Sequence, residues 1–406
     1  MRNAYKVAII GGGASGLLCA AELLSGKTPF SGDEIIVLER NDRVGKKLVA
    51  TGNGQGNFTN EKLCEARFHG ERNFVSAFLN NASSVKLTEY FYDMGIPLVK
   101  DEEGRYYPFS KQASSALDII RAFLSDKRCE IQTNCYIKTV KRAGKVYSLT
   151  DAENVTRYAE KIVLACGGCA AKQFGTDGNG YRIAEAFGHR ITRLAPSLVQ
   201  VKTETGAIRG LKGIKERVRL KLFDDAEGKN AQAKGEAVGD LLFTDYGVSG
   251  NTVFALSSRL SECVKPFFSV EFLPEISVGA LTKILSDRAN KDYIKEENVL
   301  TGIINKKTGQ AILKNVKNSA PEAVASAIKA FRLNVTGTLG FDYAQVTKGG
   351  VDTDDINPFS MQSKLSNGLF FTGEIVNVDG DCGGFNLSFA FLSAIMAARF
   401  IKNYDN

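Results

Sequence analysis

The sequence has 406 residues, 44% of them hydrophobic, which is enough for two or three domains with buried cores. A net charge of +7 is common among soluble enzymes and gives little support to a dedicated nucleic-acid-binding protein. The eight cysteines are irregularly spaced, which argues against a disulfide framework or a zinc ribbon and favours reduced thiols in the cytoplasm. No signal peptide is indicated at the N-terminus.

The first elements predict a Rossmann-type βαβ unit. Lys6–Ile10 is a continuous apolar run, typical of a parallel strand buried on both faces. A helix rich in Ala and Leu is expected over Leu17–Leu24. A second apolar strand, Glu34–Leu38, is followed directly by Glu39.

The turn between the first strand and the helix carries a G-x-G-x-x-G motif at residues 11–16. Its first glycine permits a tight turn, its second lets the backbone approach a pyrophosphate, and its third lets helix and strand pack closely. Glu39 lies 28 residues beyond Gly11, where a carboxylate can accept hydrogen bonds from a ribose. We therefore predict a bound dinucleotide, with a purely structural glycine turn as the alternative. The expected contacts are Gly11, Gly13, Ala14, Ser15, Gly16, Glu39 and Arg40.

The stretch from Asp42 to Asn60 is rich in glycine and asparagine and is too long for a simple nicotinamide domain. We interpret it as a structured loop around FAD, with a plain flexible loop as the alternative. Its expected cofactor contacts are Gly45, Lys46, Lys47, Thr51, Gly52, Gly54 and Asn57.

The next segment continues the α/β pattern. We expect helices over Ser114–Ser125 and Asp177–Gly188, and strands over Glu130–Gln132, Tyr136–Lys141, Lys145–Leu149 and Thr156–Leu164. Ile137 and Gly167 are predicted to contact the cofactor. Cys166 and Cys169 form a C-x-x-C that could relay electrons, but a tight turn of small residues is the preferred interpretation.

The pattern changes near Pro196. Residues 197–275 are expected to form an inserted β-barrel-like domain, because apolar and charged residues alternate over 217–222. Residues 276–337 are expected to form a helical domain, with Ser319 and Glu322 as a capping box before a helix over Ala323–Phe331. Residues 1–196 and 338–406 then form the FAD-binding domain.

The C-terminal segment returns to the first pattern, with a short strand over Leu369–Thr372 and a helix from Phe385 to Ile401. The helix is interrupted by polar residues and is short for a membrane span, so a buried helix is expected. Its N-terminus can stabilise negative charge on a reduced flavin. The expected contacts are Gly373, Glu374, Gly380, Gly384, Phe385 and Asn386.

These motifs together resemble the BaiN/YhiN-like family of bacterial NAD(P)/FAD-dependent oxidoreductases over nearly the whole chain. The resemblance rests on residues 7–16, 45–48, 51–54, 57–60, 175–181, 195–198, 241–250, 373–374, 378–380 and 383–387. It implies an FAD domain built from both chain ends, with a β-barrel-like part and a small helical part inserted. The sequence departs from the family pattern at Gln55 and Gly56, where Arg-Cys is usual, at Asp245, where His is common, and at Asn251, which replaces Pro.

The expected activity is hydride transfer through flavin N5 to a small organic substrate, with NAD(P)H as a transiently bound donor because no second nucleotide motif is present. The alternatives are an oxidase that uses O2, a non-catalytic FAD protein and a flavin-dependent RNA-modifying enzyme. The RNA alternative rests on a basic run within an insert that has 21 Lys and Arg against 16 Asp and Glu. Tyr246 is a candidate for facing the isoalloxazine, with a packed aromatic as the alternative. We expect no metal ion and no membrane association. The basic run on which the RNA alternative rests consists of Arg209, Lys212, Lys215, Arg217, Arg219 and Lys221.

Overall fold

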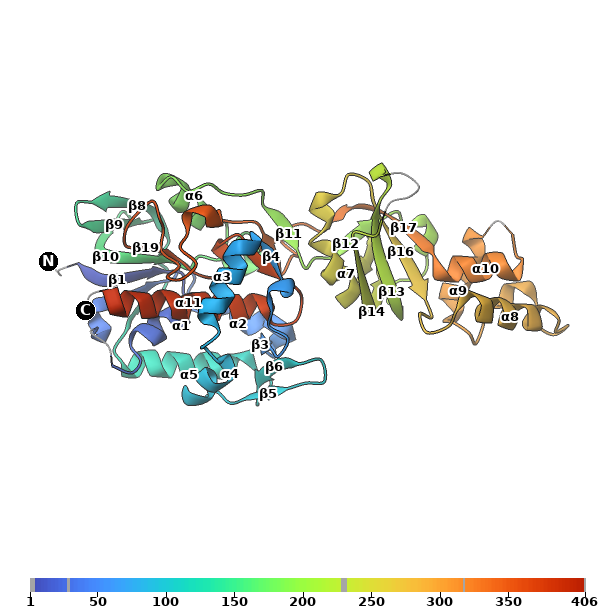
Figure 1. Ribbon diagram of the computed structural model, residues 1–406, viewed down its shortest axis with the longest axis horizontal. Helices are drawn as coiled ribbons and strands as arrows, with labels where there is room; N and C mark the ends of the chain where they lie inside the picture. The colour runs from blue at the N-terminus through green and yellow to red at the C-terminus, as the bar shows by residue number, and fades with distance from the viewer. Residues whose placement is uncertain (1–3, 28–29, 228–231, 317, 405–406) are drawn as a thin grey trace. The chain divides into compact units, whose positions relative to one another are not determined.

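The computed structural model describes residues 4–27, 30–227, 232–316 and 318–404 (Figure 1). The chain divides into two compact units. Unit 1 contains residues 1–195 and 346–406, and unit 2 contains residues 196–345.

Unit 1 is built on a seven-stranded sheet. Its strands are β1 Tyr5–Ile10, β2 Ile35–Leu38, β7 Glu130–Gln132, β8 Ile137–Ala143, β9 Val146–Asp151, β10 Thr156–Leu164 and β19 Leu369–Phe371. They lie in the order β7-β2-β1-β10-β9-β8, and β19 also pairs with β10. The strands β7, β2, β1, β10 and β19 run parallel, whereas β9 and β8 add an antiparallel edge. The expected Rossmann-type sheet is therefore confirmed, and β19 shows that the C-terminal segment completes it.

Unit 1 also contains helices (Figure 1). They are α1 Ala14–Leu23, α2 Lys46–Ala50, α3 Arg72–Ala82, α4 Leu87–Asp93, α5 Ala113–Asp126, α6 Asn179–Ala186 and α11 Phe385–Tyr404. The expected stop of α6 is confirmed, because Gly188 has a φ of 88° and its N–H donates to Glu185. By length and hydropathy α11 could cross a membrane, but two thirds of that stretch is buried inside the protein, as expected for a core helix.

Smaller elements surround the sheet. Two short sheets in unit 1 consist of β20 Val378–Gly380 with β4 Phe68–Gly70, and of β3 Thr59–Asn60, β6 Arg105–Pro108 and β5 Leu98–Lys100. A further two-stranded sheet consists of β11 Ala195–Ser197 and β18 Val346–Lys348.

The described residues of unit 2 form a closed six-stranded barrel and four α-helices. The strands are β12 Val201–Thr203, β13 Lys215–Asp224, β14 Gly235–Phe243, β15 Gly247–Ser249, β16 Pro266–Phe272 and β17 Phe331–Thr338, and the helices are α7 Asn251–Ser257, α8 Val278–Ala289, α9 Lys306–Asn315 and α10 Pro321–Lys329. The alternation in β13 is confirmed, because Val218, Leu220 and Leu222 point into the core.

Two expectations for this unit are wrong. The capping box does not form, because the Ser319 hydroxyl bonds Glu296 and α10 starts at Pro321, whose fixed φ suits a first helical position. The helix also stops at Lys329, and Phe331 opens β17. This strand closes the barrel between β12 and β16, so residues 331–337 belong to the barrel and not to the helical part.

Candidate active site

In the glycine turn between β1 and α1, three glycines are tightly packed and one, Gly13, is open. A Cβ on Gly11 would lie 2.3 Å from the carbonyl oxygen of Ala165, and one on Gly16 would lie 1.9 Å from that of Gly11. A Cβ on Gly13 would have no atom within 4 Å. Gly13 is also the N-cap of α1, where no side chain caps the helix and no acidic residue lies in the first turn. The amides of Ala14 and its neighbours can therefore receive an anion.

Glu39 is buried at the end of β2, beside this turn. One carboxylate oxygen accepts a hydrogen bond from the amide of Gly12 at 2.8 Å. The other accepts from the backbone and side chain of Asn41 at 2.8 and 2.7 Å. A carboxylate has about four lone-pair positions, so these bonds fix Glu39 and still leave acceptor capacity for hydroxyl groups. Arg40 pairs with Asp177 at 2.7 Å and lies over the ring of Tyr136.

The loop after β2 is anchored on the glycine turn, because the amide of Gly45 donates to the carbonyl oxygen of Gly12 at 2.8 Å. It contains α2 and the 3-10 helix η2 Thr51–Gly54. Gly52, Asn53 and Gly54 all have positive φ, of 57°, 55° and 88°. Glycine and asparagine are the residues that adopt this left-handed conformation most readily, which explains the composition of the loop. Lys46 pairs with the exposed Asp42.

Lys47 and Glu374 form an ion pair across 327 residues of sequence, with 2.7 Å between their charged atoms. The ammonium also donates to Ala170, and the second carboxylate oxygen accepts from the amide of Thr347 at 2.9 Å. In this arrangement Glu374 is the counter-ion of Lys47. The expected contact of Glu374 with a ribityl chain remains a prediction.

Two glycines of the C-terminal segment contact the N-terminal motifs. Gly373 has a φ of 73°, and its Cβ would lie 2.7 Å from the hydroxyl of Ser15. Gly384 has a φ of 97°, and its Cβ would lie 2.8 Å from the carbonyl oxygen of Thr59. In the amide orientation that satisfies both polar atoms, Asn57 accepts from the amide of Gly384 and donates to Thr59. The structure thus brings the two ends of the chain together around one site.

Two of the expected contacts at the start of α11 are engaged within the protein. The Asn386 side chain closes a pair of 2.8 Å hydrogen bonds with the backbone of Gly380. Phe385 is buried and its ring meets Phe68 edge to face. These residues shape the turn before α11.

The remaining candidates are spread over other elements. Ile137 is buried at the start of β8, and its carbonyl oxygen accepts from Asn179. Gly167 follows β10 with a φ of 70°. Tyr246 is a half-buried residue of unit 2, next to the exposed ion pair that Asp245 forms with Lys212.

The C-x-x-C thiols are poor nucleophiles. Burial raises the pKa of Cys166 to about 12 and also raises the pKa of Cys169. Among the described residues, no three His, Cys, Asp or Glu side chains gather closely enough to hold a metal ion.

One cluster of titratable residues was not expected as a unit. His69 on β4 lies opposite Asp379 on β20, and its Nε2 lies 3.0 Å from a carboxylate oxygen of Asp381. Asp379 is only 2% exposed, and its Oδ2 has no hydrogen-bond partner among the described residues. Burial raises the pKa of Asp379 to about 6, and the bond to Asp381 raises that of His69. The only sequence signals were the rarity of histidine and a family-like Val-Asp-Gly block.

The comparisons with known proteins cover nearly the whole chain. The family model described as the HI0933-like protein Rossmann domain matches residues 5–400. A 3-dehydro-bile acid delta(4,6)-reductase of Clostridium scindens is 32% identical over 97% of this chain and 98% of the relative. A ribosomal RNA dihydrouridine synthase of Haemophilus influenzae is 26% identical over 97% of this chain and 98% of the relative. The solved 3-ketosteroid delta1-dehydrogenase of Sterolibacterium denitrificans shares the fold, with a TM-score of 0.53 and 12% identity over 99% of this chain and all of that one.

Proposed function

Because the chain belongs to the family of the HI0933-like protein Rossmann domain, we propose that it is an FAD-dependent oxidoreductase that reduces a carbon–carbon double bond in a small organic substrate. A flavin-dependent oxidoreductase is the general class that the family and the reductase relative support. We further propose that FAD lies across the glycine turn of unit 1 and that NAD(P)H is the donor.

One observation carries the FAD site. Space is open above Gly13 at the uncapped start of α1, and the buried carboxylate of Glu39 lies at the adjoining strand end. A pyrophosphate suits the free amides and a ribose suits the carboxylate. When bound, FAD accepts or donates a hydride at N5. Lys47, Glu374 and the turn before α11 belong to segments that contact the N-terminal motifs, and we propose that they help to position the cofactor.

The names of the two relatives suggest the substrate class. A delta(4,6)-reductase and a dihydrouridine synthase both, by name, add hydrogen to a ring double bond. We therefore propose a ring double bond conjugated with a carbonyl group as the reacting unit. The greater identity to the bile acid enzyme favours a steroid-like substrate.

The FAD site is tested by Gly13→Ala. The methyl group meets open space in the FAD-free protein, so folding should survive with a loss of at most about 1 kcal/mol at the N-cap. It would occupy the place where a pyrophosphate must approach, so FAD affinity should fall about tenfold or more, or about 1.4 kcal/mol or more. Gly279→Ala in α8 is the matched control, because its Cβ also meets no atom within 4 Å. Equal FAD affinity in both variants, measured by fluorescence titration, would refute this site.

The donor is tested separately. FAD-loaded protein mixed anaerobically with NADH or NADPH should lose its yellow absorbance within seconds to minutes. Persistent colour with both nucleotides, together with bleaching by dithionite, would exclude a nicotinamide donor and leave the FAD site intact.

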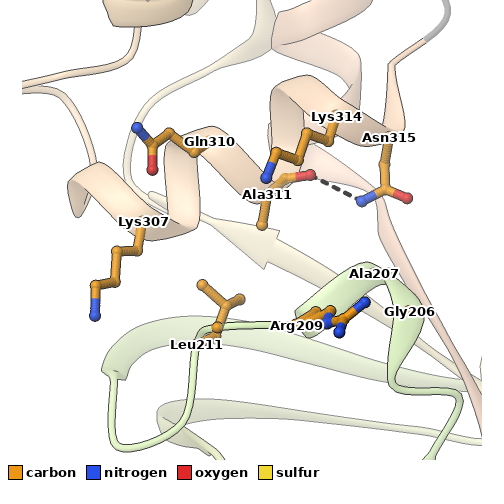
Figure 2. Close-up of a pocket in the computed structure, with 10 residues that line it drawn as sticks. Gly206, Ala207, Arg209, Leu211, Lys307, Gln310, Ala311, Lys314 and Asn315 are labelled. Atoms are coloured by element: carbon orange, nitrogen blue, oxygen red, sulfur yellow. Dashed lines mark hydrogen bonds between the residues drawn. The ribbon is translucent and has the colours of Figure 1, made fainter.

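A second candidate, an RNA-modifying enzyme, is favoured by a groove in unit 2. The groove, of about 520 Å³, lies between α9 and the loop after the 3-10 helix η5 Gly206–Ile208 (Figure 2). Within the described parts of the chain, Arg209, Lys307 and Lys314 line it without an ion-pair partner. This arrangement offers positive charge to phosphates.

The basic run expected to track RNA is weaker than its sequence implies. Four of its six cations are already paired. Lys212 pairs with Asp245, Lys215 with Asp240, Arg219 with Glu236 and Glu271, and Lys221 with Glu236. A gel-shift assay with ribosomal RNA fragments decides between the candidates. Tight binding that falls steeply with salt, and that Lys314→Gln weakens, would favour RNA; binding only at low salt would favour the small substrate.

A further inference from the structure

The paired strands β4 and β20 place four charged side chains on one face. His69 pairs with Asp379 in the ladder, and the amide of Asp381 donates to the carbonyl oxygen of Arg67 at 2.9 Å. Directly opposed residues in an antiparallel ladder point to the same side, as do residues two apart on one strand. Arg67, His69, Asp379 and Asp381 therefore form a single cluster.

Exposure increases steadily along this cluster. Asp379 is buried, the side chains of His69 and Asp381 are 23% and 26% exposed, and that of Arg67 is 44% exposed. Arg67 and His69 both contact the Asp381 carboxylate, at 3.2 and 3.0 Å. The cluster thus leads from solvent to a buried carboxyl group.

The buried end is not satisfied within the protein. Asp379 Oδ2 has no hydrogen-bond partner among the described residues, and leaving a buried polar atom unpaired costs free energy. Four charged groups influence the pKa of Asp379 electrostatically. They are His69 on β4, Lys348 on β18, Asp381 just after β20, and Glu374 in the 3-10 helix η10 Gly373–Ile375. Two of these are cations and two are anions, so their charges largely cancel.

The cluster adjoins the candidate site. Gly380 follows Asp379 directly and is held by Asn386 in the first turn of α11. Glu374, one of the groups that act on Asp379, is the partner of Lys47. Asp379 is therefore connected to both C-terminal segments of the site.

We propose that His69 and Asp379 form a proton store for the reduction, in which the His69 imidazolium holds the proton and Asp379 passes it on toward the reacting centre. The proposal rests on the proposed function, because each hydride added to a double bond requires one proton at the carbon or oxygen that receives the displaced electron pair. The Asp379 carboxylate accepts a proton from the His69 imidazolium, and the new O–H bond breaks as that proton leaves toward the reacting centre. The neutral imidazole of His69 then regains a proton from solvent. Both are positioning residues, since nothing places either against a substrate.

The chain offers a direct test because it has only two histidines. His189 is buried, its Nε2 lies 2.8 Å from the Ser363 hydroxyl, and burial lowers its pKa, so its imidazole NMR signal serves as an internal reference. Asp379→Asn should lower the titration midpoint of His69 by about one pH unit, because an opposite charge nearby favours the imidazolium. Asp354→Asn, on an exposed residue, is the matched control.

A His69 midpoint that Asp379→Asn leaves unchanged would overturn the proposal. If that variant does not fold, His69→Gln provides the reciprocal test, because loss of the imidazolium should raise the midpoint of Asp379 in carboxyl NMR. An Asp379 midpoint that does not move would equally overturn it.

A second readout distinguishes storage from mere structure. The midpoint potential of bound flavin should change its pH slope near the Asp379 midpoint in the wild type, and Asp379→Asn should remove that change. The same slope in both proteins would overturn the proposal. Failure to bind FAD at all would instead refute the proposed function, and the NMR experiment would still decide the coupling.

Discussion

Asp379→Asn makes a prediction about stability that can be worked out from the structure. The pKa of Asp379 rises from an ordinary value of 3.8 to about 6, mainly because the carboxyl is buried. The folded state therefore binds this proton more tightly than the unfolded state does. The stabilisation is fully present below pH 4 and is lost as the pH rises through 6. This rise in the pKa of Asp379 corresponds to a loss of about 3 kcal/mol of unfolding free energy between pH 4 and pH 8.

Asparagine keeps the shape of the side chain and cannot ionise. At pH 8 the variant should be more stable than the wild type by up to about 3 kcal/mol, and at pH 4 the advantage should vanish. His69 shifts in the same sense, because its raised pKa stabilises the fold below its ordinary value of 6.5 and loses that effect as the pH rises. Because Asp379→Asn also lowers the His69 midpoint, the variant loses part of this effect.

The assay is thermal unfolding of FAD-free protein between pH 4 and 8, followed by circular dichroism because the chain has no tryptophan. For a unit of this size each kcal/mol moves the midpoint by about 2–4 °C, so the two curves should separate by several degrees at pH 8. Asp354→Asn controls for loss of a surface carboxylate. If the difference in unfolding midpoint between wild type and Asp379→Asn is the same at every pH from 4 to 8, ionisation of Asp379 does not destabilise the protein.

Three further predictions concern the candidate site. Gly16→Ala should prevent unit 1 from folding, because its Cβ would lie 1.9 Å from the carbonyl oxygen of Gly11; a soluble variant with wild-type circular dichroism would contradict this. Lys47→Met alone should weaken FAD binding more than the double variant Lys47→Met/Glu374→Gln does, because the single change leaves the half-buried Glu374 carboxylate without its cation. If the losses of binding free energy in the two single variants add up to the loss in the double variant, the pair is not coupled. Cys166→Ala should retain full activity. The native Cys166 thiol should react with iodoacetamide at pH 8 far more slowly than an ordinary cysteine, because burial raises its pKa to about 12. Rapid labelling of Cys166 would support electron transfer through this thiol.

Sequence patterns predicted the local parts of unit 1 well. Continuous apolar runs located β1 and β10 because parallel strands buried on both faces need them, and the glycine motif located the turn before α1. The barrel was harder. In β17, Phe331, Leu333 and Val335 alternate with polar residues, which is the pattern of a half-buried strand, but the expected helix over Ala323–Phe331 ran into its first residue.

The long-range contacts of the site could not be predicted from the sequence. Lys47 and Glu374 each looked like a cofactor contact, and nothing local indicates that they form an ion pair. His69 and Asp379 face each other only because β4 pairs with β20. Side chains brought together by distant strand pairing have no short-range signature, so the proton-storing cluster could be found only in the structure.

The contacts that join the two chain ends also explain how the site tolerates a 150-residue interruption. Glu22 on α1 is 4% exposed, and its carboxylate meets Arg399 at 3.0 Å and Lys402 at 3.4 Å on α11. A buried carboxylate that loses its cations costs several kcal/mol, so these pairs fix the register of one helix on the other. The same packing holds Gly373 against Ser15. All of these groups belong to unit 1, so Arg399→Met should weaken FAD binding although it touches no part of the glycine turn. The surface variant Arg217→Gln in unit 2 is the control and should leave FAD affinity unchanged. Equal FAD affinity in the two variants would show that the glycine turn does not depend on the contact between α1 and α11.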